Sequence, residues 1–161
     1  MKPKECAVLP LPRIALIASD YPRLEQLARR AAEKGDLDGI FLMGEINRAE
    51  IVPDESDDLR SLVTVGSWVT YCTNRGAPPG TVQLMWPEEC SSDPARISVL
   101  TPLGAALIGL KAGDQMPYVV AGCLNVVRVQ NVTRSGPNVV PLFRGARRGE
   151  PFDDDPGPTA A

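Results

Sequence analysis

Apolar residues recur every three or four positions in the first third of the chain. This spacing places side chains on one face of a helix, and between Tyr21 and Lys34 the positions are Leu24, Leu27, Ala28 and Ala31. Ser19 or Asp20 can cap such a helix, and Pro22 fits its first turn, where the missing N–H costs nothing. We therefore expect an amphipathic helix over residues 21–34.

A second helical pattern follows a short break. The run Gly35–Gly39 ends the first helix, and apolar spacing resumes over Ile40–Ile51 at Leu42, Ile46 and Ala49. Two amphipathic helices joined by a short turn predict an antiparallel hairpin, here over residues 19–52. At 1.5 Å per residue, helices of roughly 13 residues are only about 20 Å long.

Two less regular segments flank this hairpin. Residues 1–18 are interrupted by prolines and contain one short apolar run, Ile14–Ala18, which we expect to be extended. Residues 53–61 are acidic and predict a solvated linker that could act as a hinge.

From residue 62 the pattern changes to short segments rich in β-branched residues and bounded by glycine or proline. We expect one helix, Pro102–Gly109, and strands at Leu62–Cys72, Thr81–Trp86, Arg96–Leu100, Gln115–Ala121 and Leu124–Thr133. The order β-β-β-α-β-β predicts an α+β fold, with a largely antiparallel sheet and one helix over residues 62–133. Residues 134–161 contain little that could form a core, and we expect a disordered tail.

Composition narrows the possible functions. Hydrophobic residues make up 43% of the 161 residues and aromatic residues only 5%, so the core must be aliphatic. The formal net charge is −3, which disfavours autonomous binding to nucleic acid and favours a protein partner. The chain has no histidine, the usual general base near neutral pH.

The four cysteines do not form a metal-binding motif. They are Cys6, Cys72, Cys90 and Cys123, and no two are spaced as C-x-x-C. A zinc site would need four distant segments to converge, so we expect reduced thiols and no cofactor. No signal peptide and no span of about 20 apolar residues is visible, which predicts a cytoplasmic protein without a membrane segment.

The most informative stretch is Arg96–Asp114. Thr101 can cap a helix that begins at Pro102 and stops at Gly109, and the pair Gly113-Asp114 supplies a turn into the next strand. Taken on physical grounds alone, these residues could serve packing and nothing more.

This stretch resembles the C-terminal-domain motif of the Gre transcript-cleavage factors and of Rnk proteins. The resemblance is carried by Ser98, Thr101, Pro102, Leu103, Gly104, Ala106, Leu107, Ile108, Gly109, Gly113 and Asp114. Three further segments are similar in the same order along the chain, namely Ser19–Leu24, Asn47–Val52 and Val63–Val69. The resemblance covers roughly residues 14–133.

The resemblance implies an FKBP-like C-terminal fold that docks at the rim of the RNA polymerase secondary channel. The residues corresponding to the polymerase contact are Leu100, Thr101, Pro102, Leu103 and Gly104, and Leu100 stands where Gre factors often carry an acidic residue. Gre factors also place acidic residues at the tip of a long coiled coil, where they help to hold a catalytic Mg²⁺ and promote transcript cleavage. Asp36 and Asp38 occupy the corresponding tip here.

The predicted arm is too short to reach the polymerase active site. We therefore expect a monomeric, non-enzymatic regulator that binds polymerase without stimulating cleavage, with Asp36 and Asp38 serving as ordinary turn residues. Three alternatives stay open. These are an active cleavage factor, a prolyl isomerase with Trp68, Tyr71 and Trp86 around a pocket, and an effector of nucleoside diphosphate kinase that acts directly or through transcription.

Overall fold

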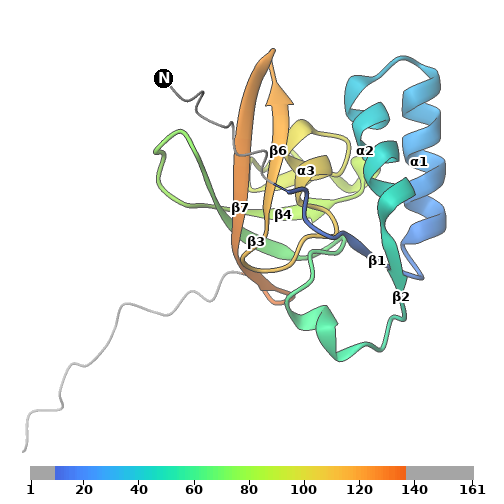
Figure 1. The fold of residues 1–161 in the computed structure, drawn as a ribbon, viewed down its shortest axis with the longest axis horizontal. Helices are drawn as coiled ribbons and strands as arrows, with labels where there is room; N and C mark the ends of the chain where they lie inside the picture. The colour runs from blue at the N-terminus through green and yellow to red at the C-terminus, as the bar shows by residue number, and fades with distance from the viewer. Residues whose placement is uncertain (1–9, 137–161) are drawn as a thin grey trace, which may run out of the picture.

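A computed structural model describes residues 10–136 of the chain. Two helices, α1 (Tyr21–Glu33) and α2 (Leu37–Arg48), precede a curled sheet that carries one further helix, α3 (Pro102–Leu107) (Figure 1). The expected α+β class is confirmed. The predicted disordered tail lies outside the described residues from position 137 onward.

The main sheet has five strands in the order β5-β4-β3-β7-β6. All neighbouring pairs are antiparallel except β4 and β5, which run parallel. The strands are β3 (Trp68–Thr73), β4 (Gly80–Met85), β5 (Arg96–Ser98), β6 (Gln115–Val120) and β7 (Cys123–Thr133). The predicted order of strands around one helix is therefore observed.

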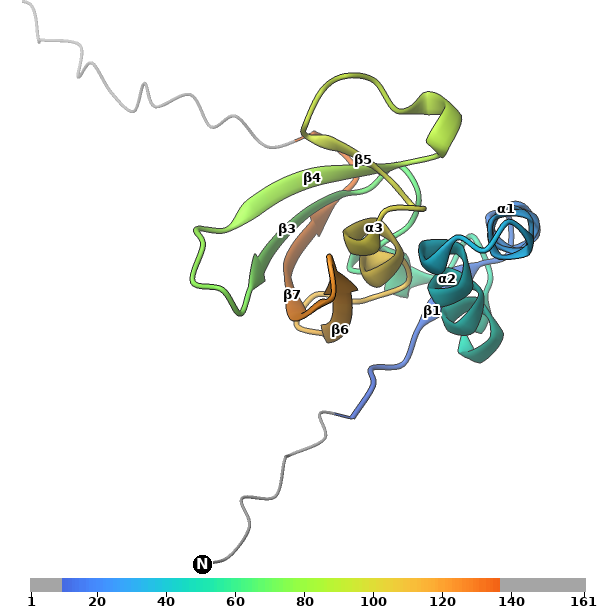
Figure 2. The ribbon, with the colours of Figure 1, turned by 90° about the horizontal axis from the view of Figure 1, so that it is seen from above.

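Helices α1 and α2 lie side by side and run in opposite directions (Figures 1 and 2). Gly39 allows their close approach, because a Cβ there would overlap the side chain of Ala31 and lie 2.8 Å from the nitrogen of Ala32. The predicted start of α2 at Ile40 was wrong by one turn. The Asp36 carboxylate accepts a hydrogen bond from the Asp38 N–H at 3.0 Å. Asp36 is thus the N-cap of α2, which begins at Leu37.

The end of the second helix was also predicted wrongly. Helix α2 stops at Arg48, and Glu50–Val52 forms strand β2, which pairs in parallel with β1 (Ala15–Ile17). The N–H of Glu50 donates to the carbonyl oxygen of Ile14, directly before β1, at 2.8 Å. This hydrogen bond replaces the one that the Glu50 N–H would have made inside a longer α2. The segment before residue 19 is thus part of the fold from Ile14 onward.

The expected hinge between the helices and the sheet is tied down. Its end forms a 3-10 helix, η1 (Asp57–Arg60), whose Leu59 is buried against Ala15 and Leu62. The predicted strand from Leu62 begins only at Trp68. The residues before it form a turn, in which the Ser67 hydroxyl lies 2.9 Å from that of Thr64.

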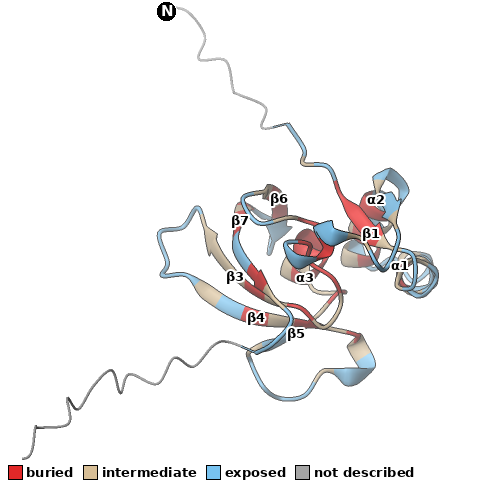
Figure 3. Ribbon diagram, turned by 90° about the horizontal axis from the view of Figure 1, so that it is seen from below, coloured by how far each residue is buried: buried red, intermediate tan, exposed pale blue. Residues whose placement is uncertain are grey.

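One hydrophobic core joins the helices to the sheet. Leu24, Leu42 and Ile46 from the helices belong to the same cluster as Leu107 and Met116 from the sheet side. Figure 3 shows buried residues on β1, α2 and α3 and on parts of β3 and β4. Because this core is continuous, the two helices are held along the sheet domain.

Gly109 makes a close backbone contact between the N-terminal part and the sheet domain. Its φ is +77°, and a Cβ there would overlap Ile14 Cγ2 and lie 2.9 Å from Ala15 O. The Ala15 N–H donates to Gly109 O at 3.1 Å. Only glycine satisfies both the backbone angle and the available space.

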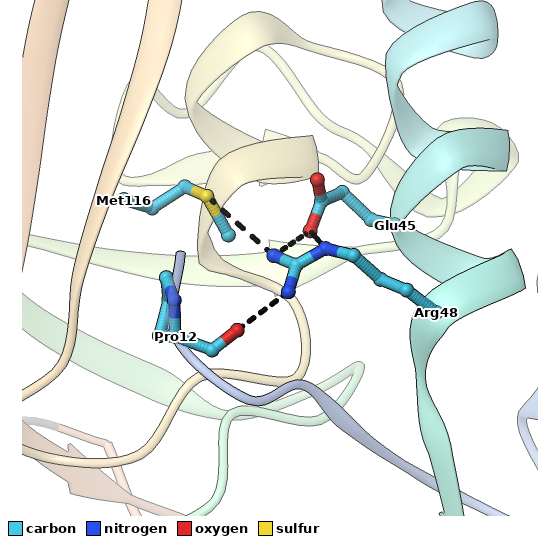
Figure 4. A network of polar contacts seen from close by, with 4 residues as sticks. All are labelled: Pro12, Glu45, Arg48 and Met116. Atoms are coloured by element: carbon cyan, nitrogen blue, oxygen red, sulfur yellow. Dashed lines mark hydrogen bonds and ion pairs between the residues drawn. The ribbon is translucent and has the colours of Figure 1, made fainter. Parts of the chain in front are cut away.

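Arg48 fixes the segment before β1 (Figure 4). Its guanidinium pairs with the buried Glu45 carboxylate and donates to Pro12 O at 2.5 Å. Its other terminal nitrogen lies 4.0 Å from Met116 Sδ on β6. One side chain therefore connects α2, the N-terminal segment and the edge of the sheet.

Replacing Gly109 tests this junction. We expect Gly109→Ala to lower the free energy of unfolding by roughly 2–4 kcal/mol, because it adds a steric clash to the cost of a left-handed backbone. Gly113→Ala is the matched control, since Gly113 has φ +97° with nothing near the added Cβ. It should lose only about 1 kcal/mol. Urea denaturation followed by circular dichroism measures both, and equal losses would contradict a tight junction.

Candidate functional site

The segment before α3 is built by hydrogen bonds of Ser98 and Thr101. The Thr101 hydroxyl donates to Ser98 O at 2.7 Å and accepts the Gly104 N–H at 3.0 Å. The Ser98 hydroxyl accepts the Leu100 N–H at 3.1 Å. The expected capping role of Thr101 is confirmed, and the turn is rigid because each polar group has a partner.

Of the five residues predicted to contact a partner, four are half-buried and one is buried. Leu100, Thr101, Pro102 and Leu103 are half-buried, and the two leucines pack against the core. Gly104 is buried, and a Cβ there would overlap Ser98 O and lie 2.8 Å from the Thr101 hydroxyl. Gly104 therefore shapes the turn from within, and the four half-buried residues before it offer the accessible surface of the turn.

An apolar groove of about 640 Å³ lies beside Pro102. It runs between the start of α2 and the tip of the β6–β7 hairpin. We call it the α2–hairpin groove, and it is lined by Leu37, Asp38, Phe41, Pro102, Pro117, Tyr118, Val119, Ala121, Gly122 and Leu124. Pro102 and Asp38, which the sequence placed in separate motifs, thus line one groove.

Large apolar side chains are exposed around this groove. Leu37 is 78% exposed, Leu124 68% and Val119 57%. Folding normally hides such residues, and an apolar patch of this kind on a soluble protein indicates an interaction surface. None of the three was predicted from the sequence, because Leu37 fell in the predicted break between the helices, and Val119 and Leu124 each fit a predicted strand.

The acidic end of the groove is formed by the turn between the helices. Asp36 is exposed and caps α2, while Asp38 is partly buried at the groove wall. Burial raises the pKa of the Asp38 carboxyl above its usual value, and the negative charge of Asp36 raises this pKa further. The groove therefore combines an apolar floor with a negatively charged rim.

The three aromatic residues considered for an isomerase pocket do not meet in one cavity among the described residues. Trp86 is buried beneath the Arg23 guanidinium, which lies 4.1 Å from the ring centroid and also pairs with Glu88. Tyr71 packs on Gly80 of the neighbouring strand, and Trp68 lies near Gly136.

Metal chemistry finds no support within residues 10–136, where no three cysteine, aspartate or glutamate side chains gather. Cys72, Cys90 and Cys123 are free thiols. Within the same range, every helix is too short or too polar to cross a membrane. What the described residues offer is an apolar groove with exposed side chains around it.

Comparisons with known proteins agree with this description. The family model for the C-terminal part of the transcription elongation factors GreA/GreB matches residues 58–134, and the Rnk N-terminus model matches residues 12–52. A solved prokaryotic transcription elongation factor GreA/GreB from Nitrosomonas europaea is 30% identical, with a TM-score of 0.61 over 75% of this chain and 99% of that one. The chain belongs to the GreA/GreB family.

Curated relatives place the chain beside the Rnk branch of this family. The regulator of nucleoside diphosphate kinase from Escherichia coli K12 is 29% identical over 114 residues, which cover 69% of this chain and 81% of that protein. The protein of the same name from Shigella flexneri matches equally well. The relatives are thus named as a regulator or as transcription elongation factors.

Substitutions at Thr101 test the turn that presents Pro102 in this Gre-type domain. We expect Thr101→Val to lower the free energy of unfolding by about 1 kcal/mol, because the Gly104 N–H loses its cap. Thr101→Ser keeps the hydroxyl and should lie within a few tenths of a kcal/mol of the wild type. Thermal or urea denaturation distinguishes them, and equal stability of the two variants would show that the cap is unimportant.

Proposed function

We propose that this protein is a cytoplasmic regulator that binds RNA polymerase at the rim of the secondary channel, as a monomer, without stimulating transcript cleavage. Membership of the GreA/GreB family supports polymerase as the partner. The α2–hairpin groove and the accessible edge of the Thr101–Gly104 turn form the proposed docking surface. They offer apolar anchors next to an acidic rim.

The position of the helices supports the proposed absence of cleavage stimulation. Helix α1 has 13 residues and α2 has 12, so each is about 20 Å long. Their apolar faces belong to the core of the sheet domain, and Ala31 near the end of α1 packs against Gly39. An arm held in this way cannot extend its tip far from the docked domain.

The tip also lacks the properties expected of a metal-positioning group. The carboxylate of Asp36 is engaged in capping α2, and the carboxyl of Asp38 faces the groove. Both are explained by local structure. The proposed effect on transcription is therefore occupation of the channel entrance, in competition with factors that carry longer arms.

Binding to polymerase is tested by Pro102→Asp. A charge at the groove wall should weaken capture of core polymerase at least tenfold in a pull-down or by surface plasmon resonance. An unpaired charge is costly to bury at an interface. The fold should persist, because aspartate suits the first turn of a helix.

Pro94→Asp is the matched control for this experiment. Pro94 is exposed in the loop before β5, away from the groove, so the same chemical change should leave binding intact. Unchanged binding by Pro102→Asp, or equal loss by both variants, would place the interface elsewhere.

The absence of cleavage stimulation is tested with backtracked elongation complexes. We expect the wild-type protein to leave the rate of transcript cleavage unchanged while reducing the stimulation caused by an added Gre factor. Stimulated cleavage that disappears in the double variant Asp36→Ala, Asp38→Ala would overturn this part of the proposal and favour an active cleavage factor.

A further inference from the structure

The α2–hairpin groove leaves an apolar surface exposed in the free protein, and its surroundings indicate what can cover it. We propose that residues 1–9 of the same chain bind in this groove and compete with the partner for it. The binding within the chain stands independently of the partner, whereas the competition rests on the polymerase-docking function proposed above.

The first observation is where the described N-terminal segment begins. Residues 10–14 run from β1 past the side of the sheet on which β6 lies (Figures 1 and 2). Arg48 holds Pro12 O at 2.5 Å and lies 4.0 Å from Met116 Sδ (Figure 4). The next residue, Pro117, lines the groove. The segment is therefore anchored beside one end of the groove.

The second observation is reach. Nine residues span up to about 30 Å when extended, whereas the part of β6 beside the groove, from Pro117 to Val120, is only about 10 Å long. The C-terminal segment starts in a much less favourable place. Gly136 lies against Trp68, at the opposite end of β7 from the hairpin tip. The 11 residues of β7 separate these ends by about 35 Å.

The third observation is chemical complementarity. The sequence of residues 1–9 is MKPKECAVL, with the apolar run Ala7-Val8-Leu9 next to the anchor and two lysines farther out. The groove is arranged in the same order, with apolar residues along β6 and Asp38 at the start of α2. Asp36 is exposed two positions before Asp38. A segment that begins at Pro117 would thus bring Lys2 and Lys4 toward the two aspartates.

Attachment makes a weak interaction effective. A short tether gives the segment a local concentration near the millimolar range, so contacts too weak to hold a separate peptide still occupy the groove for much of the time. A partner that needs the groove then binds with an apparent dissociation constant equal to its intrinsic value divided by the fraction of chains whose groove is open.

The test compares the amide NMR spectra of the full chain and a variant that begins at Pro10. We expect amide shifts of Leu37, Phe41 and Leu124 to differ between them, although these residues are far from the truncation in sequence. Adding the peptide MKPKECAVL at millimolar concentration, which matches the local concentration of the attached segment, should move the same resonances of the truncated protein back toward the full-chain positions. The double variant Lys2→Glu, Lys4→Glu of the full chain should move them toward the truncated form.

Removal of residues 137–161 is the matched control and should leave the groove resonances in place. Identical groove shifts in the full and Pro10-start chains overturn the proposal. So do groove shifts that depend on residues 137–161, or on protein concentration, because the occupant would then be the C-terminal segment or a second copy.

Affinity for core polymerase separates this inference from the function on which it rests. The variant that begins at Pro10 should bind about three- to tenfold tighter than the full chain. Opening of the groove without a gain in affinity would show that polymerase docks elsewhere, and would leave binding of the segment to the groove intact.

Discussion

The close contact between Gly109 and the Ile14–Ala15 backbone determines how the rest of the molecule is arranged. It seats β1 against the sheet domain, and β1 in turn pairs with β2, which directly follows α2. The helices are thereby fixed at both ends of their path, by the strand before α1 and the strand after α2. A three-residue parallel pairing is weak alone, but here it is backed by a continuous core.

That arrangement creates the groove. Because α2 is held along the sheet domain, its first turn faces the β6–β7 hairpin, and Asp38 comes to the same wall as Pro102. These residues are 64 positions apart in sequence and belong to different elements. The surface therefore exists only when the helices are docked. A change that loosened the β1 junction would alter binding without touching a residue of the groove.

The sequence predicted the elements better than their ends and their neighbours. Helix α1 has strong periodicity, and α3 has a threonine cap and glycine stop, so both were found nearly to the residue. The pairing of β1 with β2 was missed because each is three residues long and the partners are 35 positions apart. The spacing of apolar residues within a short segment does not indicate which distant segment it pairs with. The groove was missed for a related reason, since Leu37 and Leu124 look apolar without showing that their faces lack a cover.

In this fold, packing of the helices in the core limits how long the helical arm can be. The buried residues of α1 are Leu24, Ala28 and Ala31, which extend over most of the helix. Helix α2 lies between α1 and the sheet domain (Figure 2). A turn added beyond Ala31 would therefore project into solvent, where only the paired helix could cover its apolar face. A long arm must therefore be stabilised as a separate coiled coil, whereas this short pair draws its stability from the domain beneath it. The same sheet domain can accordingly carry a long pair of helices or a short pair, depending on where the helices end.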